Sequence, residues 1–305
     1  MSVVLGVDGG GTNTRAAIFA DGRMVGKGQS GSIKRLRVGA EAAEVNLRMA
    51  LNEACAQAGV KAVNAACCGI ASPTMPGVKE WVTAVFDDFG VARSEVVGDV
   101  DIALDAAFEG GPGILQIAGT GSNCVGRAPN GSLESAGGWS SRLGDEGSGY
   151  WIGVNSVRRA LHALDRDEPC RVIPEVMKLW GTKDMDEFIN LGDGTPGPDY
   201  AALAPTINEL AEAGDAVAVG TLEQAAKDLV DFVLLVRSKL RRKYGLTSEV
   251  PVAWTGSVIA KTKIVREKFF AGLRAAAPEM PVGTEEVVAL KGAIWRAERL
   301  AEAGN

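Results

Sequence analysis

The chain has 305 residues and a mass of 31.7 kDa, a length that predicts two domains at about 100–200 residues each. Hydrophobic residues make up 46% and charged residues 23%, which excludes a disordered or fibrous protein. The net charge of −6 argues against a broad nucleic-acid-binding surface. No apolar run reaches the roughly 20 residues that span a bilayer, so we expect no membrane partner.

The histidine and cysteine content narrows the possible chemistry. His162 is the single histidine, which excludes a Ser-His-Asp triad combined with a multi-histidine metal site, and its helical surroundings favour a plain helix residue. The five cysteines include no C-x-x-C pair and are odd in number, which argues against a disulfide framework or a zinc ribbon. With no secretory signal pattern at the N-terminus, the sequence predicts a reducing, cytoplasmic compartment.

Strand patterns open the chain and then alternate with helical ones. Apolar runs predict strands at residues 3–7, 16–20, 23–29, 62–70 and 95–97. Helical spacing predicts helices at residues 41–58, ended by Gly59, and at residues 78–89. This β-β-β-α-β-α-β order predicts a mixed sheet with helices on its faces.

The opening pattern returns about 108 residues later. An apolar strand, a glycine turn with a hydroxyl residue and a return strand occur first at residues 4–20 and again at 114–127. Self-similarity at this separation predicts two related α/β domains. Helices are expected at residues 149–163, 173–179, 185–190, 200–213, 216–243 and 258–277, with a strand at 250–254.

Two glycine-rich turns are candidate phosphate-binding sites. Asp8-Gly-Gly-Gly-Thr12 allows close approach to the backbone, its N–H groups can form an anion-binding nest, and Thr12 and Thr14 add hydroxyls. Asp8 could hold a hydrated Mg²⁺. The alternative is a tight hairpin whose glycines only supply positive φ. The matching Gly119-Thr-Gly-Ser122 favours phosphate binding, because two such hairpins can converge on one anion.

Asp99 stands where a predicted strand gives way to a helix. As a helix N-cap it would contribute about 1 kcal/mol to stability. As a general base it would take a proton from an attacking hydroxyl, which is typically worth about 10²–10⁴ in rate. Asp101 is a rival for the same role, and the sequence leaves these alternatives open.

The glycine-rich segment 136–151 carries two tryptophans, Trp139 and Trp151, and two adjacent acids, Asp145 and Glu146. A tryptophan face beside carboxylates suits a sugar ring, which has an apolar face and a rim of hydroxyls. The alternative is a structured loop that caps a helix starting near Ser148, with the acids near its positive end. Glu146 fits that alternative better than Asp145 does.

Taken in order, these motifs resemble those of the N-acetylglucosamine kinase/BadF-BadG-type ATPase family, within the sugar-kinase, heat-shock-chaperone and actin superfamily. The motifs that carry the resemblance are Asp8-Gly-Gly-Gly-Thr12, Gly98-Asp99, Gly119-Thr-Gly-Ser-Asn123, Gly137-Gly-Trp139, Gly144-Asp-Glu-Gly-Ser-Gly-Tyr-Trp151, Ala211-Glu-Ala-Gly-Asp215 and Thr255-Gly-Ser257. The resemblance implies an α/β fold with two ribonuclease-H-like, actin-type ATPase domains and a central cleft. The domains would cover residues 1–106 and 107–285, with a C-terminal helix near 286–303 packing on the first.

The resemblance also implies a function and a set of site residues. It implies ATP and Mg²⁺ as cofactors, a homodimer, and phosphorylation of an amino sugar, most simply N-acetylglucosamine at its 6-hydroxyl. Asp99 matches the catalytic base, and Asp8 would bind Mg²⁺ through water. The positions that match nucleotide-binding residues are Gly10, Gly11, Thr12, Thr120, Ala211, Gly256 and Ser257. The positions that match sugar contacts are Ser122, Asn123, Gly138, Trp139 and Asp145.

One departure from the family bears on the substrate. N-acetylglucosamine kinases offer the sugar an asparagine after the first hairpin, whereas this chain reads Gly31-Ser-Ile-Lys-Arg-Leu-Arg37. The basic residues either meet an anionic or differently substituted sugar or form a solvated surface loop. Glucosamine and other hexoses are therefore alternative substrates.

Other functions on related folds are also possible. A ROK-type sugar kinase would carry a cysteine-rich zinc motif with a histidine, which this sequence lacks. An ATPase that activates a radical dehydratase would need iron–sulfur cysteines, whereas Cys124 is expected to be an inward-facing strand residue. A nucleotide-dependent sugar sensor is the remaining alternative. The presence of Asp8, Asp99 and both glycine hairpins favours the kinase over the sensor.

Overall fold

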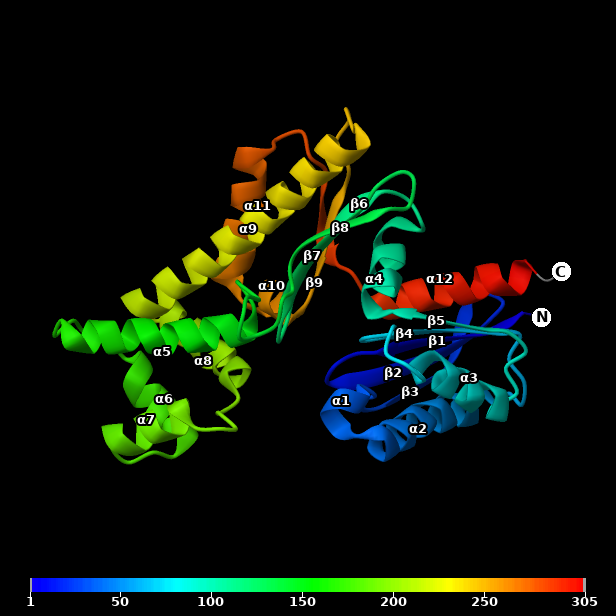
Figure 1. Cartoon of the computed structure of the whole chain (residues 1–305), viewed down its shortest axis with the longest axis horizontal. Helices are drawn as coiled ribbons and strands as arrows, with labels where there is room; N and C mark the ends of the chain where they lie inside the picture. Colours follow the sequence, from blue (N-terminus) through cyan, green and yellow to red (C-terminus); the bar gives the residue numbers. More distant parts are fainter. Residues whose placement is uncertain (1, 304–305) are drawn as a thin grey trace. The chain divides into compact units, whose positions relative to one another are not determined.

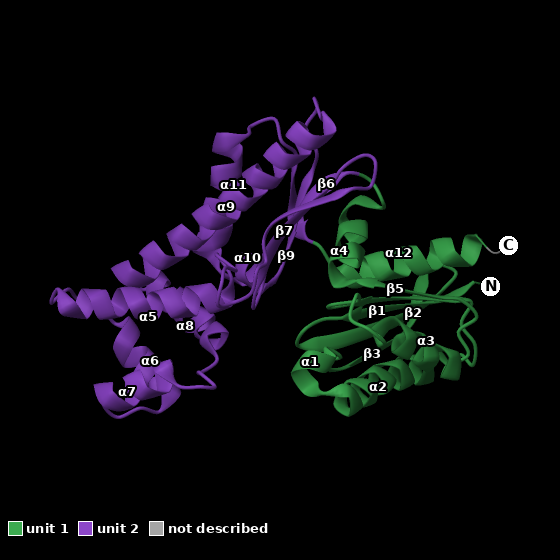
Figure 2. Cartoon of the chain, in the orientation of Figure 1, with its two compact units in different colours: residues 1–111, 287–305 green, residues 112–286 purple. Residues whose placement is uncertain are grey.

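The computed structural model describes residues 2–303, which form two compact units (Figures 1 and 2). Unit 1 comprises Met1–Gly111 with Val287–Asn305, and unit 2 comprises Pro112–Glu286. Each unit is built on one five-stranded sheet that carries helices. The expected α/β class is confirmed.

The sheet of unit 1 has the strand order β3-β2-β1-β4-β5. Its strands are β1 (Val3–Gly9), β2 (Asn13–Ala20), β3 (Arg23–Gly31), β4 (Ala65–Ile70) and β5 (Ser94–Gly98). The first three strands are antiparallel neighbours, while β4 and β5 run parallel to β1. This is the mixed sheet that the element order predicts.

Helices cover both faces of this sheet (Figure 1). One core cluster joins the sheet to α2 (Ala40–Ala58) and α3 (Val78–Asp88). A second joins it to α4 (Asp99–Phe108) and α12 (Ala289–Glu302). A Cβ on Gly6 of β1 would lie 2.8 Å from the side chain of Ile294, so a glycine is needed for α12 to pack this closely. The C-terminal helix thus belongs to unit 1.

The sheet of unit 2 repeats this topology. Its order is β10-β9-β6-β7-β8, so β6, β7, β8, β9 and β10 take the places of β1 to β5. Its strands are β6 (Gly113–Ala118), β7 (Ser122–Arg127), β8 (Leu133–Gly137), β9 (Val252–Thr255) and β10 (Val282–Glu286). The sequence repeat at a separation of about 108 residues is therefore a repeat of whole sheets.

Unit 2 is the more helical of the two. Its helices are α5 (Gly149–Asp165), α6 (Val172–Trp180), α7 (Met185–Asp193), the 3-10 helix Tyr200–Leu203, α8 (Ala204–Glu212), α9 (Ala216–Tyr244), α10 (Ser257–Lys261) and α11 (Lys263–Ala276). One hydrophobic core joins these helices to the sheet. The expected helix at 258–277 is wrong as a single element, because Thr262 has an extended backbone that separates α10 from α11.

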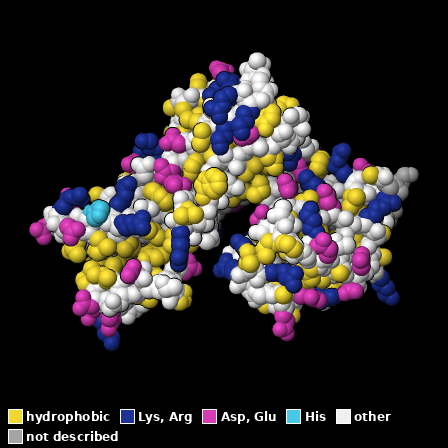
Figure 3. Space-filling view, viewed as in Figure 1, with side chains coloured by type: hydrophobic (Ala, Val, Ile, Leu, Met, Phe, Trp, Pro, Cys, Tyr) yellow, Lys and Arg dark blue, Asp and Glu magenta, His cyan; other side chains and the backbone are white. Residues whose placement is uncertain are grey.

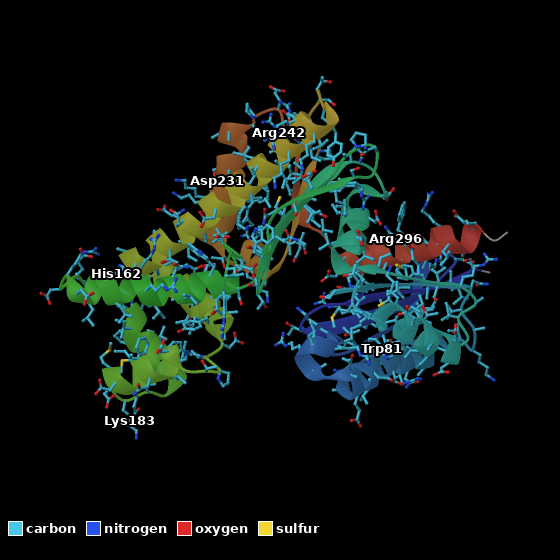
Figure 4. The ribbon with its side chains drawn as sticks, viewed as in Figure 1. Trp81, His162, Lys183, Asp231, Arg242 and Arg296 are labelled. Atoms are coloured by element: carbon cyan, nitrogen blue, oxygen red, sulfur yellow. The ribbon has the colours of Figure 1, made fainter. Side chains whose placement is uncertain are left out.

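The distribution of charged side chains on the viewed face fits the small net charge of the chain. Acidic and basic side chains are interspersed over the viewed face in Figure 3. His162 is exposed on α5, as Figure 4 shows, and is the plain helix residue that the sequence predicts. Among residues 2–303, no helix combines the length and the apolar composition that crossing a bilayer requires.

Candidate active site

The first glycine hairpin lies at the carboxyl end of β1. None of Gly9, Gly10 and Gly11 has a positive φ, so the interpretation that these glycines only supply such a backbone is wrong. Packing explains Gly9, whose Cβ would collide with the side chain of Ile33. Gly11 is different, because a Cβ there would meet no atom within 4 Å. Nothing inside the described chain requires a glycine at position 11.

The second hairpin has the same property. Gly119 has no positive φ, and a Cβ there would also meet nothing within 4 Å. Each hairpin thus presents an exposed threonine, Thr12 or Thr120, directly after a glycine with open space beside it. Such a glycine lets a ligand approach the backbone N–H groups closely. Thr14 does not share this exposure, because it is buried and its hydroxyl donates to the Gly31 carbonyl at 2.8 Å.

The start of α5 holds the second hairpin in place. The Gly149 N–H donates to the Gly119 carbonyl at 2.8 Å, and the Tyr150 N–H donates to the Thr120 carbonyl at 3.2 Å. Ser148 caps the helix, because its hydroxyl accepts from the Trp151 N–H. The segment 144–151 that the sequence analysis singled out is therefore the anchor of this hairpin.

Asp8 and Asp99 lie at the carboxyl ends of two parallel strands of unit 1. Asp8 of β1 is in register with Gly69 of β4, which is in register with Val97 of β5, and Asp99 follows as the first residue of α4. Burial raises the pKa of Asp8; the Arg15 guanidinium lowers this pKa and the Asp99 carboxylate raises it. The two carboxylates are therefore close enough to interact.

The structure separates the roles of Asp99 and Asp101. The N-cap of α4 is Gly98, and the Asp101 carboxylate accepts the Gly98 N–H at 2.9 Å, as the third helical residue does in a capping box. The interpretation of Asp99 as the N-cap is thus wrong. Burial raises the pKa of Asp99, while the N–H of Val100 and the charge of Lys34 lower it. Asp99 Oδ1 accepts from that N–H at 2.9 Å.

The basic segment after the first hairpin is a short helix, α1 (Arg35–Val38), which the sequence analysis did not predict. Arg37 Nη1 donates to the Gly11 carbonyl at 2.8 Å and to Thr12 Oγ1 at 3.2 Å. Arg35 lies over the Trp81 ring, 5.2 Å from its centroid. The segment is therefore a short helix and not a loop; it contacts the glycine hairpin through Arg37, while Leu36 and Arg37 stay exposed at the surface as the alternative expected.

Four of the five expected sugar contacts come together in unit 2. The Ser122 hydroxyl donates to the Glu146 carbonyl at 2.7 Å, and a Cβ on Gly138 would lie 2.8 Å from Asn123 Cγ. A Cβ on Gly121 would lie 2.9 Å from Asp145 Oδ2, which brings that carboxylate to the hairpin. Burial raises the pKa of Asp145.

Trp139 and Asn123 differ in their exposure. Trp139, the fifth expected contact, is 77% exposed. Asn123 Oδ1 is buried and accepts no hydrogen bond from any described residue. Buried acceptors normally find a donor, so Asn123 Oδ1 is an exception among the described residues.

A cavity of about 300 Å³ lies beside the second hairpin. Of the expected nucleotide contacts in unit 2, Thr120 and Ser257 line it. Gly256 lies next to it with a φ of +110°, and a Cβ there would collide with the Ala118 carbonyl. Ala211 packs into the hydrophobic core instead of forming part of the cavity wall.

Sequence reasoning missed the side chains that α8 and α10 add to this cavity. They are Ala204, Pro205, Asn208, Glu209, Val258 and Lys261. The residues from α8 lie within two turns before the expected Ala211. A helical projection of residues 204–212 could have found the residues from α8, because it separates the buried positions of that helix from its more exposed ones.

The carboxylate of Asp8 has the chemistry of a magnesium ligand. In the described part of the chain no group of three or more His, Cys, Asp or Glu side chains could hold a metal ion. Mg²⁺ needs no such cage, since it usually keeps several waters and takes one or two carboxylates plus substrate phosphates. Asp8 would supply the carboxylate of that arrangement, and the charge of Asp99 nearby adds to the negative potential that favours a cation.

Comparison with known proteins assigns the family. The model of the BadF/BadG/BcrA/BcrD ATPase family matches residues 5–294, nearly the whole chain. The chain belongs to this ATPase family. Cys124 is the inward-facing strand residue that the sequence predicts, because it lies in β7 and is fully buried. Burial also raises the pKa of its thiol.

Relatives of this ATPase-family chain include several sugar kinases. It is 30% identical to an N-acetylmuramic acid/N-acetylglucosamine kinase of Clostridium acetobutylicum, with 88% of this chain and 89% of that protein covered. It is 28% identical to a glucosamine kinase of Vibrio cholerae, with 78% and 82% covered. A solved structure of a proposed N-acetylglucosamine kinase from Chromobacterium violaceum is 26% identical, with a TM-score of 0.74 and 96% and 98% of the chains covered.

Proposed function

We propose that this protein is an ATP-dependent amino-sugar kinase that phosphorylates the 6-hydroxyl of N-acetylglucosamine. The observation that carries the proposal is the pair of exposed Gly-Thr turns, in which Gly11 and Gly119 have open space and no backbone reason to be glycine. The family membership supports ATP as the phosphate donor. The kinases among the relatives support an amino sugar as the acceptor.

In this proposal the phosphates of ATP bind the backbone N–H groups and hydroxyls of the two hairpins. The residues involved are Gly10, Gly11, Thr12 and Thr120. Ser257 lines the nucleotide cavity, Gly256 lets the chain pass close to β6, and Ala211 supports the wall from the core. Asp8 holds Mg²⁺ through water, and the ion neutralises charge on the transferring phosphoryl group when bound.

Asp99 is the catalytic base of the proposed reaction. Its Oδ1 accepts the Val100 N–H, which orients the carboxyl group and leaves Oδ2 to accept the proton of the sugar hydroxyl. Burial moves the pKa of Asp99 up from that of an ordinary aspartate, toward the working pH, which suits a general base. Backbone N–H groups of the hairpins stabilise the charge on the transferring phosphoryl group.

The sugar would contact Ser122, Asn123, Gly138, Trp139 and Asp145. The Asn123 side chain and the Asp145 carboxylate would hydrogen-bond to hydroxyls of the sugar. The exposed Trp139 ring offers an apolar face to the ring carbons. Gly138 keeps the approach to Asn123 free of a side chain.

An N-acetylated sugar that carries a carboxylate is a second candidate substrate. The charge of Lys34 acts on Asp99, and Arg37 binds the hairpin at Gly11, so two cations lie near groups that would contact the acceptor and the phosphate. A cation in this position would stabilise a substrate carboxylate. The relative from Clostridium acetobutylicum is named for both N-acetylmuramic acid and N-acetylglucosamine.

Two further parts of the proposal concern the whole protein. A homodimer rests on the family resemblance. A cytoplasmic location rests on the cysteine pattern, and all five cysteines are free thiols. Size-exclusion chromatography with light scattering tests the first, and fractionation of the producing cells tests the second.

A coupled assay of ADP release with Mg-ATP tests the proposed reaction. The sugar panel contains N-acetylglucosamine, glucosamine, N-acetylmannosamine, N-acetylmuramic acid and glucose. We expect sugar-dependent release with the N-acetylated sugars, and a preference for N-acetylmuramic acid would support the second candidate. Release that does not depend on sugar would overturn the kinase assignment in favour of an activating ATPase. No release with any sugar would favour a sensor.

A further inference from the structure

The short helix α1 of unit 1, labelled in Figure 1, places two cations beside two different parts of the candidate site. The charge of Lys34, the N-cap of α1, lowers the pKa of Asp99, the candidate base. Arg37 contacts the first hairpin instead, where its Nη1 donates to the Gly11 carbonyl at 2.8 Å and to Thr12 Oγ1 at 3.2 Å. One helical turn therefore reaches from the candidate base to the candidate phosphate hairpin.

Most of the Arg37 guanidinium remains available to a ligand. The side chain is exposed, as is that of Thr12. A guanidinium carries five N–H donors in a planar fork, so three remain on Nε and Nη2 even when both hydrogens of Nη1 serve the hairpin. Among residues 2–303, Nε and Nη2 of Arg37 donate to no other group. The fork thus presents free donors directly beside the hairpin.

The contact with Arg37 also leaves the Thr12 hydroxyl free to donate. Because Thr12 Oγ1 accepts from Arg37, its own hydrogen can go to another group, and no residue in the described part of the chain accepts it. Gly11 adds open space on the same turn. A hydroxyl donor and a guanidinium fork around an open backbone suit the oxygens of a phosphate group.

We infer that Arg37 binds the terminal phosphoryl group of ATP and stabilises it during transfer to the sugar. This inference rests on the proposed function, because it adds a catalytic residue to the same reaction. In that reaction the bond from the terminal phosphorus to the bridging oxygen of ADP breaks and a bond to the sugar oxygen forms. The proton of the sugar hydroxyl goes to Asp99.

The position of α1 assigns Arg37 to the terminal phosphate and not to an inner one. Asp99 would hold the attacking hydroxyl, and the helix that carries Arg37 also carries the cation that acts on Asp99. The phosphate on this side of the hairpin is therefore the one that moves. Its negative charge is spread over three outer oxygens during transfer, and a guanidinium fork can bind two of them at once. Arg37 belongs to none of the motifs that carry the family resemblance.

Titration calorimetry of the full chain with Mg²⁺ tests the contact without turnover, using ADP and the β,γ-imido analogue of ATP. The two ligands differ by the terminal phosphate. In Arg37→Gln, we expect affinity for the imido analogue to fall about tenfold or more while affinity for ADP stays within about twofold. The kcat with N-acetylglucosamine should fall about 10²–10³-fold, the effect typical of losing one donor to developing charge. Arg37→Lys keeps the charge without the fork and should restore part of both losses.

Arg35→Gln is the matched control on the same helix. The Arg35 guanidinium lies over the Trp81 ring, 5.2 Å from its centroid, and has no contact with the hairpin among the described residues. This variant should keep both affinities and the kcat of the unmodified protein. Melting temperatures of the variants show whether α1 and the hairpin remain folded, and we expect Arg37→Gln to melt close to the unmodified protein because Arg37 is exposed.

The outcomes separate this inference from its rivals. Equal losses of affinity for ADP and the imido analogue in Arg37→Gln would mean that Arg37 only braces the hairpin, which overturns the inference. Normal turnover of N-acetylglucosamine with a loss confined to N-acetylmuramic acid would assign Arg37 to a substrate carboxylate and overturns it too. Unchanged affinities and turnover have the same consequence.

Failure of the proposed kinase gives a different result. If Arg37→Gln selectively weakens the imido analogue but no sugar is turned over by the unmodified protein, the kinase is overturned and the contact with the terminal phosphate stands. Binding of neither nucleotide by the unmodified protein overturns both.

Discussion

Arg296 of α12 pairs with Asp105 of α4 across 191 residues of sequence, and the same guanidinium donates to Glu95 at 2.8 Å (Figure 4 labels Arg296). The Asp105 side chain is 1% exposed. This pair ties the C-terminal helix to the helix that begins with Asp99. The last helix of the chain therefore helps to hold the candidate catalytic base in its place.

Arg296→Met should destabilise the protein strongly. The change removes the Arg296 guanidinium from the buried Asp105 carboxylate, and removing one member of a buried pair typically costs about 3–5 kcal/mol. Chemical denaturation followed by tryptophan fluorescence measures the loss. Arg48→Met is the matched control, because Arg48 pairs with half-exposed carboxylates that water still solvates, so this variant should lose far less stability. Equal losses for the two variants would contradict a stabilising role of the buried pair.

Asp99→Asn should reduce kcat by roughly 10²–10⁴ and leave ATP binding nearly intact, because the amide keeps the shape but cannot take the proton. Asp101→Ala is the matched comparison. It removes the capping bond to Gly98, so it should cost about 1 kcal/mol of stability while kcat changes little. Turnover assays and nucleotide titration give both quantities. Near-normal activity of Asp99→Asn would assign the base to another carboxylate.

Lys34→Gln should move the acidic limb of the kcat/KM profile to higher pH. The Lys34 charge lowers the pKa of Asp99, so its removal raises that pKa and the base becomes protonated at a higher pH. Burial raises the pKa of Asp99 from its ordinary value, so the limb should start at a higher pH than for an exposed aspartate. Lys27→Gln, an exposed lysine on β3, should leave the limb where it is. A limb that moves to lower pH would exclude Asp99 as the titrating group.

Gly11→Ala should separate ligand binding from folding. A methyl group at position 11 meets no atom within 4 Å and the φ there is not positive, so stability should stay within about 1 kcal/mol. If phosphate approaches this backbone, the methyl group should reduce kcat/KM for ATP by about tenfold or more. Gly283→Ala, in ordinary contact on β10, is the control and should leave kcat/KM unchanged. Full activity of Gly11→Ala would remove this hairpin from the phosphate site.

Much of the architecture could be predicted from local signals. The strand–turn–strand pattern around Asp8 and its repeat around Gly119 depend on side-chain alternation and glycine spacing, which act within a few residues. The break between α10 and α11 was missed because it consists of the single residue Thr262. Strand β10 was missed because it has only five residues, and the tertiary structure decides its pairing with β9. Short elements carry too little periodicity to be found alone.

The same division applies to the candidate site. By itself the sequence determined the two Gly-Thr turns, the carboxylates Asp8 and Asp99 and the family, because these are contiguous motifs. Only the tertiary structure decided that Asp101 is a capping residue, that Arg37 binds the hairpin, and that residues of α8 line the cavity beside the second hairpin. Each of these depends on which groups packing brings together, and residue spacing along the chain does not encode that.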